Sequence, residues 1–265
     1  MLRKDMFPRR PDPVETLTGR SAGTALPKAI SPEGGGGKFD LDGKVRHWPG
    51  NTVLCHLDRT SPAHALLAEL QDKVRRSAFG GLFTYLPADS FHMTVFQGWS
   101  PFLPDENAWP EGVPRDATRD GTTDVLRRKF DGLTLPQRFR IRPDGLFGLH
   151  SLTVCGADDE EERRLRDARI AMRDASGLVP RDFDSYVFHV SLAYQLRWVD
   201  DAMAREMVAF SDELGSAFAA EVPEIEIGPC ELCDFENMHH FEPVLYLGNN
   251  HVEGDQAQSG REGHT

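Results

Sequence analysis

The chain has 265 residues, 39% of them hydrophobic, which is enough to bury a sizeable core. Its formal net charge of -12 at pH 7 argues against a protein that captures long nucleic acid on a basic surface. No apolar run approaches the roughly 20 residues of a membrane-spanning helix, and the basic N-terminus lacks the apolar stretch of a secretory signal. We therefore expect no membrane association.

Both ends of the chain are expected to be poorly structured. Residues 1–37 contain Pro-Asp-Pro and four consecutive glycines, and the tail 250–265 is similarly polar. Such segments bury too little apolar area to offset the entropy lost when they become ordered. We therefore expect the globular domain to span residues 38–249.

The first half of this domain predicts a strand, a helix and a second strand. Residues 52–57 form an apolar strand candidate. Residues 62–77 place leucines at helical spacing behind Ser61, a residue type that caps helices. The second strand candidate spans about 90–97 and contains the motif Phe91-His92-Met93-Thr94-Val95.

The second half repeats this order. A strand is predicted at 152–155 and a charged helix at about 159–175, whose acidic start favours a helix N-terminus. A strand at about 186–195 then contains Phe188-His189-Val190-Ser191-Leu192. The agreement in order and spacing between the two halves indicates an internal duplication.

The remaining elements are expected to close the fold. A Pro-rich loop is expected at 101–114. The mixture of strands and helices in a chain of this length indicates an α/β or an α+β fold. The other predicted elements are a helix at 122–130, a half-buried strand with a basic face at 138–142, an amphipathic helix at 200–219, and closing strands at 225–235 and 244–247.

The two histidine strands carry the candidate chemistry. Residues two apart on a strand share a face, so His92 lies beside Thr94 and His189 beside Ser191. Imidazoles titrate near neutral pH, and a pair in opposite protonation states can serve as base and acid on a phosphodiester. Hydroxyl donors nearby would stabilise charge on the phosphoryl oxygens. This chemistry requires no metal.

Two aromatic residues and a basic strand have alternative interpretations. Tyr85 and Phe96 are predicted either to stack on a nucleobase or to pack in the core. Phe96 is expected on the strand face of His92 and Thr94. The arginines of 138–142 either add positive potential to the cleft or form a solvated edge.

The motifs His92-x-Thr94 and His189-x-Ser191 resemble the paired His-x-Thr/Ser signatures of the 2H phosphoesterase superfamily. That superfamily includes RNA 2′-5′ ligase-like enzymes and 2′,3′-cyclic nucleotide phosphodiesterases. The resemblance covers about 45–249, and the segment GKFDLDGKVRHWPGNTVLCHL also resembles an uncharacterised, mainly bacterial branch.

The resemblance implies an α+β, bilobal fold with two pseudo-twofold-related lobes, each a β-sheet flanked by helices, around a central cleft. It implies that His92 and His189 are acid and base, in an order left open, with Thr94 and Ser191 as phosphate ligands. The family opens 2′,3′-cyclic phosphates to 2′-phosphates, and some members join or cleave 2′-5′ linkages. With the acidic charge, this favours a small cyclic nucleotide or an oligonucleotide end, and no metal or cofactor.

Two alternatives remain open. The cleft could bind a nucleotide or RNA end without turnover, as a sensor or adaptor. Cys230-x-x-Cys233 followed by His239-His240 could instead hold zinc, although the spacing is unlike a standard finger. Four cysteines do not make a disulfide framework in a chain of this length, so we expect a reduced, cytoplasmic protein and a monomer.

Overall fold

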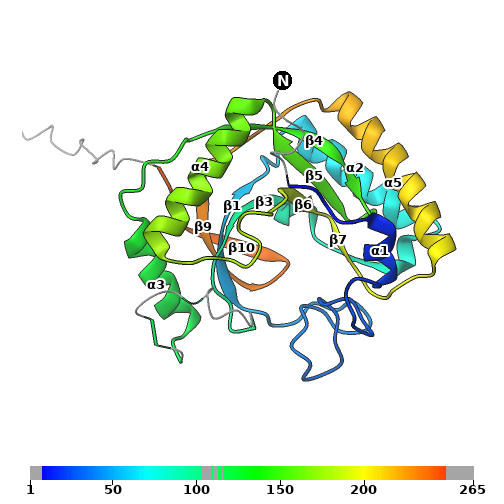
Figure 1. The fold of residues 1–265 in the computed structure, drawn as a ribbon, viewed down its shortest axis with the longest axis horizontal. Helices are drawn as coiled ribbons and strands as arrows, with labels where there is room; N and C mark the ends of the chain where they lie inside the picture. Colours follow the sequence, from blue (N-terminus) through cyan, green and yellow to red (C-terminus); the bar gives the residue numbers. More distant parts are fainter. Residues whose placement is uncertain (1–7, 103–108, 110–112, 115, 249–265) are drawn as a thin grey trace, which may run out of the picture.

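The structure is a computed structural model that describes residues 8–102, 109, 113–114 and 116–248 (Figure 1). The predictions for residues 1–7 and for the tail 250–265 lie outside the described residues, as does most of the loop expected at 101–114.

One curled, eight-stranded antiparallel sheet forms the centre of the molecule (Figure 1). Two further strands, β2 (Phe83–Tyr85) and β7 (Ala193–Gln195), pair separately with each other. The order across the large sheet is β10 (His240–Tyr246), β9 (Glu231–Asn237), β1 (Gly50–His56), β3 (His92–Gln97), β6 (His189–Ser191), β5 (Ser151–Gly156), β4 (Phe139–Phe147) and β8 (Ile225–Ile227).

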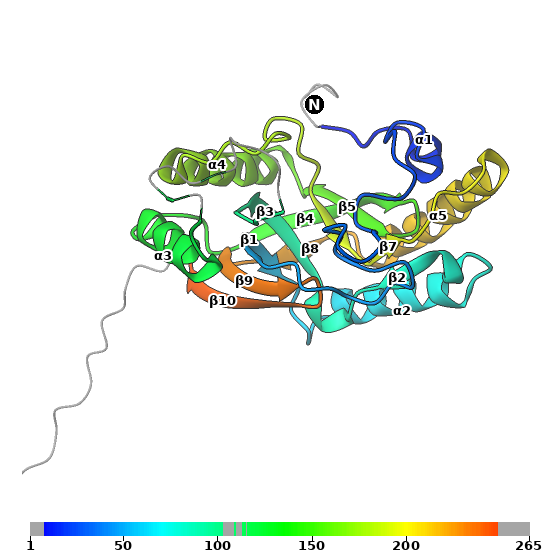
Figure 2. The same ribbon diagram turned by 90° about the horizontal axis from the view of Figure 1, so that it is seen from below.

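The helices gather in two groups, with α3 and α4 at one end and α1, α2 and α5 at the other (Figures 1 and 2). Among the described residues, no helix is long and apolar enough to cross a membrane. Their bounds are α1 (Pro13–Thr18), α2 (Pro62–Arg76), α3 (Arg119–Phe130), α4 (Asp159–Ser176) and α5 (Asp201–Glu221), with short 3-10 turns at Gly80–Leu82 and Ala88–Ser90.

Local capping explains where the two predicted repeat helices begin. The Ser61 side chain accepts a hydrogen bond from the His64 amide at the start of α2. Asp158 accepts from the amides of Glu160 and Glu161 at the start of α4. Both predicted helices are confirmed, and the acidic run at 158–162 serves the helix N-terminus as expected.

The duplicated units meet at the middle of the sheet. In each unit the first strand pairs antiparallel with the histidine strand, β1 with β3 and β5 with β6. The two histidine strands are neighbours, with Met93 opposite Val190. Four strands lie on each side of this junction in one continuous sheet, and the separation into two lobes stays a prediction.

The second histidine strand is shorter than expected. The sequence predicted one strand over about 186–195, but β6 ends at Ser191 and β7 pairs with β2 in the small sheet. The amides of Leu192 and Ala193 both donate to the carbonyl of His150, which turns the chain out of the large sheet. This break depends on a partner 42 residues away (192 − 150), so local pattern does not reveal it.

The main core lies on one face of the central strands. It contains all six apolar residues of the two motifs, together with buried side chains of the helices, such as Leu67 of α2, Met172 of α4 and Phe218 of α5. Helix packing on this face leaves the opposite, polar face of β3 and β6 available for a site. The motif residues in the core are Phe91, Met93, Val95, Phe188, Val190 and Leu192.

Residues 8–37 are placed against the globular domain, in contrast to the poorly structured segment expected from their composition. Asp12 caps α1, and Leu17 is fully buried in the main core. Ile30 and Phe39 are buried in a second cluster with Trp48. These apolar residues are far apart in sequence, and each fills a gap between other elements, so no periodic pattern signals their burial.

Candidate active site

A cavity of about 1090 Å³ opens on the polar face of β3 and β6. His92, Thr94, His189 and Ser191 all line it, as strand alternation predicted. Each side chain stands on a short central strand whose opposite face is held by the main core. The sheet thus presents both motifs to one solvent-filled space.

The pairing of β3 with β6 fixes how the four side chains lie relative to one another. Because Met93 lies opposite Val190, His92 lies across from Ser191 and Thr94 across from His189. The two imidazoles therefore occupy diagonal positions, which are roughly 7–8 Å apart in antiparallel pairs. Each imidazole has one hydroxyl beside it on its own strand and another directly across.

Both imidazoles are oriented by the same main-chain contact. The Nδ1 atom of His92 lies 2.7 Å from the carbonyl oxygen of Ser90, and that of His189 lies 2.8 Å from the carbonyl oxygen of Val187. A carbonyl only accepts, so each Nδ1 carries the hydrogen and each neutral ring keeps Nε2 as its acceptor. Each half of the duplication thus supplies an imidazole whose Nε2 can accept a proton.

Burial shifts the titration of both rings in the same direction. It lowers the pKa of His92 to about 4, with smaller contributions from the nearby charges of His56 and Lys38. It lowers the pKa of His189 to about 3, and the positive charge of Arg10 lowers it further. Both imidazoles are therefore neutral at pH 7 in the free protein, and an anion bound between them would favour protonation of one.

Tyr186 is a site residue that the sequence did not predict. It lines the cavity beside Thr94 and His189, and its ring centroid lies 6.0 Å from that of His189. Burial raises its pKa to about 12, so the phenol stays protonated and can donate. The guanidinium carbon of buried Arg169 lies 4.3 Å from the Tyr186 ring centroid, and this cation–π contact helps to fix the position of the ring.

Lys38 supplies positive charge inside the cavity. Its Nζ lies 4.7 Å from the ring centroid of Trp48 and 3.4 Å from the hydroxyl of Tyr194. Among the described residues, no carboxylate lies within ion-pair distance of it. Lys28 and Arg181 also line this cavity, together with the carboxylate of Asp182, so cationic side chains outnumber acidic ones in this pocket of a protein whose net charge is -12.

The structure does not bring Phe96 or Tyr85 to the cavity. The β1–β3 register shifts, so that Leu54 pairs with Thr94 but Val53 with Phe96, and this β-bulge reverses the alternation after Thr94. Phe96 is therefore fully buried in the core, and Gln97 lines the cavity instead. Tyr85 donates from its hydroxyl to the Gly80 carbonyl in the core.

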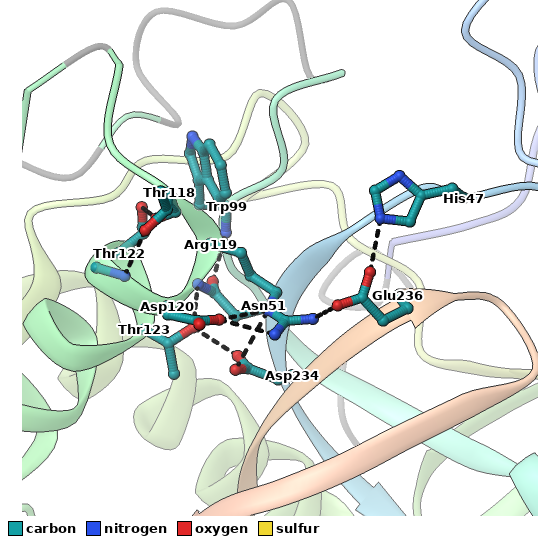
Figure 3. Close-up of polar contacts among 11 residues, drawn as sticks. His47, Asn51, Trp99, Thr118, Arg119, Asp120, Thr122, Thr123, Asp234 and Glu236 are labelled. Carbon is teal, nitrogen blue, oxygen red and sulfur yellow. Dashed lines mark hydrogen bonds and ion pairs between the residues drawn. The ribbon is translucent and has the colours of Figure 1, made fainter.

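A polar network supports the far wall of the cavity (Figure 3). Asn51 accepts from the Trp99 amide at 2.8 Å and donates to the Thr123 hydroxyl at 3.1 Å, and Thr123 donates to Asp234. Arg119 forms ion pairs with Asp234 and with Glu236, which also contacts His47. These contacts tie α3 to β1 and β9 and fix Asn51 and Trp99, both of which line the cavity.

The zinc alternative is not supported in the form that the sequence suggested. The Cys230 sulfur lies 3.8 Å from that of Cys55 in the main core, whereas Cys233 is buried in the second cluster. His239 lies against Phe39, so the expected ligands do not converge.

A different group of potential ligands lies next to the site. One ligand atom each of His56, Glu231 and Cys233 lie within 4.8 Å of one another. These groups already contact each other, His56 Nδ1 with Glu231 at 2.7 Å and Cys233 Sγ with Glu231 at 3.9 Å. His56 lies opposite His92 across β1 and β3, with ring centroids 6.1 Å apart. The structure therefore shows His56 as a side chain that packs beside His92.

Residues 38–148 match the family model 2H-phosphodiest, described as a domain of unknown function (DUF1868). This match places residues 38–148 in the 2H phosphoesterase superfamily. It confirms the resemblance drawn from the motifs and supports a phosphoesterase-type function. The matched range includes His92 and Thr94, whereas His189 and Ser191 lie beyond it.

A crystal structure shows the same fold. The conserved protein of unknown function ATU0111 from Agrobacterium tumefaciens strain C58 is 26% identical, with a TM-score of 0.81. The similarity covers 91% of this chain and 100% of the Agrobacterium chain. No curated protein matches the sequence.

Proposed function

We propose that this protein opens a 2′,3′-cyclic phosphate, or a related small phosphodiester, by acid–base catalysis between His92 and His189. The observation that carries the proposal is the matched orientation of the two rings. Each donates from Nδ1 to the carbonyl two residues before it, and each lines the same cavity.

The reaction needs one proton taken and one proton given. The Nε2 of one imidazole removes a proton from water as the water oxygen bonds to phosphorus. The other imidazole, protonated, gives its proton to the ribose O3′ as the P–O3′ bond breaks, which leaves a 2′-phosphate. Either histidine could take either role. Positioned proton transfer of this kind is worth about 10²–10⁴-fold in rate.

Hydroxyl groups around the rings would stabilise the phosphoryl oxygens. Thr94 and Ser191 lie on the same strand faces as the histidines, and the protonated phenol of Tyr186 lines the same cavity. Donors fixed in place before the reaction stabilise developing charge without reorganising. No step of this mechanism requires a metal ion.

The rest of the cavity fits a nucleoside. Trp48, Tyr194 and Phe241 provide aromatic surface, and Lys38 provides a cation. Stacking of a base on an aromatic side chain contributes roughly 1–3 kcal/mol. A small nucleotide could therefore be held by its base while its phosphate reaches the two imidazoles.

Hydrolysis of adenosine 2′,3′-cyclic phosphate by wild type, His92→Ala and His189→Ala tests the proposal. We expect each substitution to lower kcat by about 10²–10⁴-fold and EDTA to leave the wild-type rate unchanged. His240→Ala is the matched control, because His240 is exposed and paired only with Glu242.

Full activity in either alanine variant would exclude the His/His mechanism. A wild-type protein that turns over no phosphodiester in a panel, yet binds 2′- or 3′-phosphorylated nucleotides in calorimetry, would instead be a binding protein that uses the same cavity.

A further inference from the structure

A half-buried cation near the second motif, Arg10, has no anionic partner among the described residues. The guanidinium of Arg10 lies with its central carbon 5.0 Å from the ring centroid of Phe147. Its hydrogen bond is a long one, from Nη2 to the Ser151 hydroxyl at 3.5 Å. Its Nε is buried and has no hydrogen-bond partner.

Strand pairing places Arg10 next to the second motif. In the β5–β6 pair, Ser151 lies opposite Ser191 and Thr153 opposite His189. Arg10 contacts Ser151 and lines, together with Thr153, a cavity of about 600 Å³. The charge of Arg10 also helps to lower the pKa of His189, after the larger effect of burial.

The other arginines of this second cavity differ from Arg10. Arg166 forms an ion pair with Glu162 at 2.7 Å, Arg142 lies 3.6 Å from Asp144, and Arg9 is exposed. Arg10 combines a buried, unused donor atom with a contact to Ser151, which lies opposite Ser191 of the second motif. Burial without a counterion is costly for a cation and lowers the pKa of Arg10.

The segment that carries Arg10 is anchored. Two residues later Asp12 caps α1, and Leu17 of that helix is fully buried against the main core. Arg10 is thus held near the polar face of β5 and β6 before any ligand arrives. A guanidinium can donate two parallel hydrogen bonds to a phosphate, and these charge-assisted bonds are strong.

We propose that Arg10 binds an anionic oxygen of the phosphate on which His92 and His189 act, from the β5 side of the site. The inference rests on the proposed function for the identity of that phosphate. It adds to the paired motifs a phosphate ligand from the N-terminal segment, outside the duplicated units.

Binding of adenosine 2′-monophosphate to wild type, Arg10→Met and Arg10→Lys, measured by calorimetry, tests the inference without requiring turnover. We expect about 10- to 100-fold weaker binding for Arg10→Met, the range for losing a hydrogen bond to a charged group. Arg10→Lys should keep part of the affinity. The control Arg76→Met changes the net charge equally at an exposed position of α2 that lines neither cavity, and it should bind as wild type does.

Thermal unfolding separates binding from a structural role. Without nucleotide, Arg10→Met should be at least as stable as wild type, because it removes an uncompensated buried charge. With nucleotide, wild type should gain more in Tm than the variant. A lower Tm without nucleotide together with unchanged affinity would show that Arg10 is structural and overturn the inference.

The two proposals fail in different ways. If wild type binds the nucleotide but hydrolyses no phosphodiester, the catalytic function fails, and the affinity ratio between wild type and Arg10→Met still decides the role of Arg10. Equal affinity in those two proteins, or no nucleotide binding by wild type, would overturn the Arg10 inference.

Discussion

The two motif histidines are equivalent in their contacts but not in their charged neighbours. Each ring donates from Nδ1 to the main chain and lines the cavity. The positive charge of Lys38 helps to lower the pKa of His92, whereas that of Arg10 helps to lower the pKa of His189. Both cations come from residues before the duplicated units. They add an anion-attracting field to a site whose own strands supply imidazoles and hydroxyls.

These surroundings predict how activity depends on pH. The proposed mechanism needs one imidazolium, but burial lowers the pKa of His92 to about 4 and that of His189 to about 3. Above those values the protonated fraction of the free protein falls about 10-fold per pH unit. We therefore expect kcat/KM for adenosine 2′,3′-cyclic phosphate to rise as the pH is lowered from 8 to 5.

The pH dependence of kcat should be weaker, because kcat reports the complex, in which the bound phosphate raises the pKa of the acid. Initial rates over this pH range, on protein shown to stay folded by circular dichroism, would measure both profiles. A kcat/KM that increases toward alkaline pH would contradict this charge assignment.

At the scale of elements, helix caps and strand alternation could be predicted from the sequence, because each depends on residues close together in the chain. The caps at Ser61 and Asp158 and the strand alternation of both motifs located α2, α4 and the polar face. The bulge that buries Phe96 depends on the pairing of β3 with β1. The end of strand β6 at Ser191 depends on hydrogen bonds to the distant carbonyl of His150. Such features have no local pattern, which is why Phe96 was expected in the site.

The N-terminal segment gives a direct test at this scale. Leu17 is fully buried in the main core, so Leu17→Ala should lower the free energy of unfolding by about 2–5 kcal/mol. Leu41→Ala is the control, since its side chain is 53% exposed and its loss should cost less than about 0.5 kcal/mol. Urea unfolding would measure both. Equal, small effects would mean that α1 does not share the cooperative fold.

Over the whole molecule, charge is distributed unevenly. The chain carries a net charge of -12, yet the cations near the two motifs include Lys28, Lys38 and Arg181 in the main cavity and Arg10 beside His189. By contrast, Arg138 and Arg140 of the predicted basic strand face are paired with glutamates and Asp158. The basic face of β4 is thus exposed and neutralised, but β4 pairs with β5 on one side and β8 on the other, so it is not the edge strand that one interpretation of the sequence expected.

This distribution predicts that ligand length adds little to affinity. A short cationic pocket in an acidic molecule can neutralise one or two phosphates, whereas a protein that follows a nucleic acid neutralises many. Ribo-oligonucleotides of two and of twenty nucleotides, each ending in a 2′-phosphate, should bind within about threefold of each other. The logarithm of affinity should fall with the logarithm of salt concentration with a slope of about -0.7 to -1.4, the value for one or two contacts to a single strand.

A 20-mer without the terminal phosphate serves as the control and should bind far more weakly. Calorimetry at several salt concentrations would measure all three ligands. Affinity that rises more than about tenfold with length, together with a slope steeper than about -3, would require a continuous basic track. Such a result would make a long RNA the ligand. The expected result confines recognition to the terminal phosphate and the nucleosides beside it, because Lys28, Lys38 and Arg181 line the cavity that holds both motifs, whereas the chain as a whole has a net charge of -12.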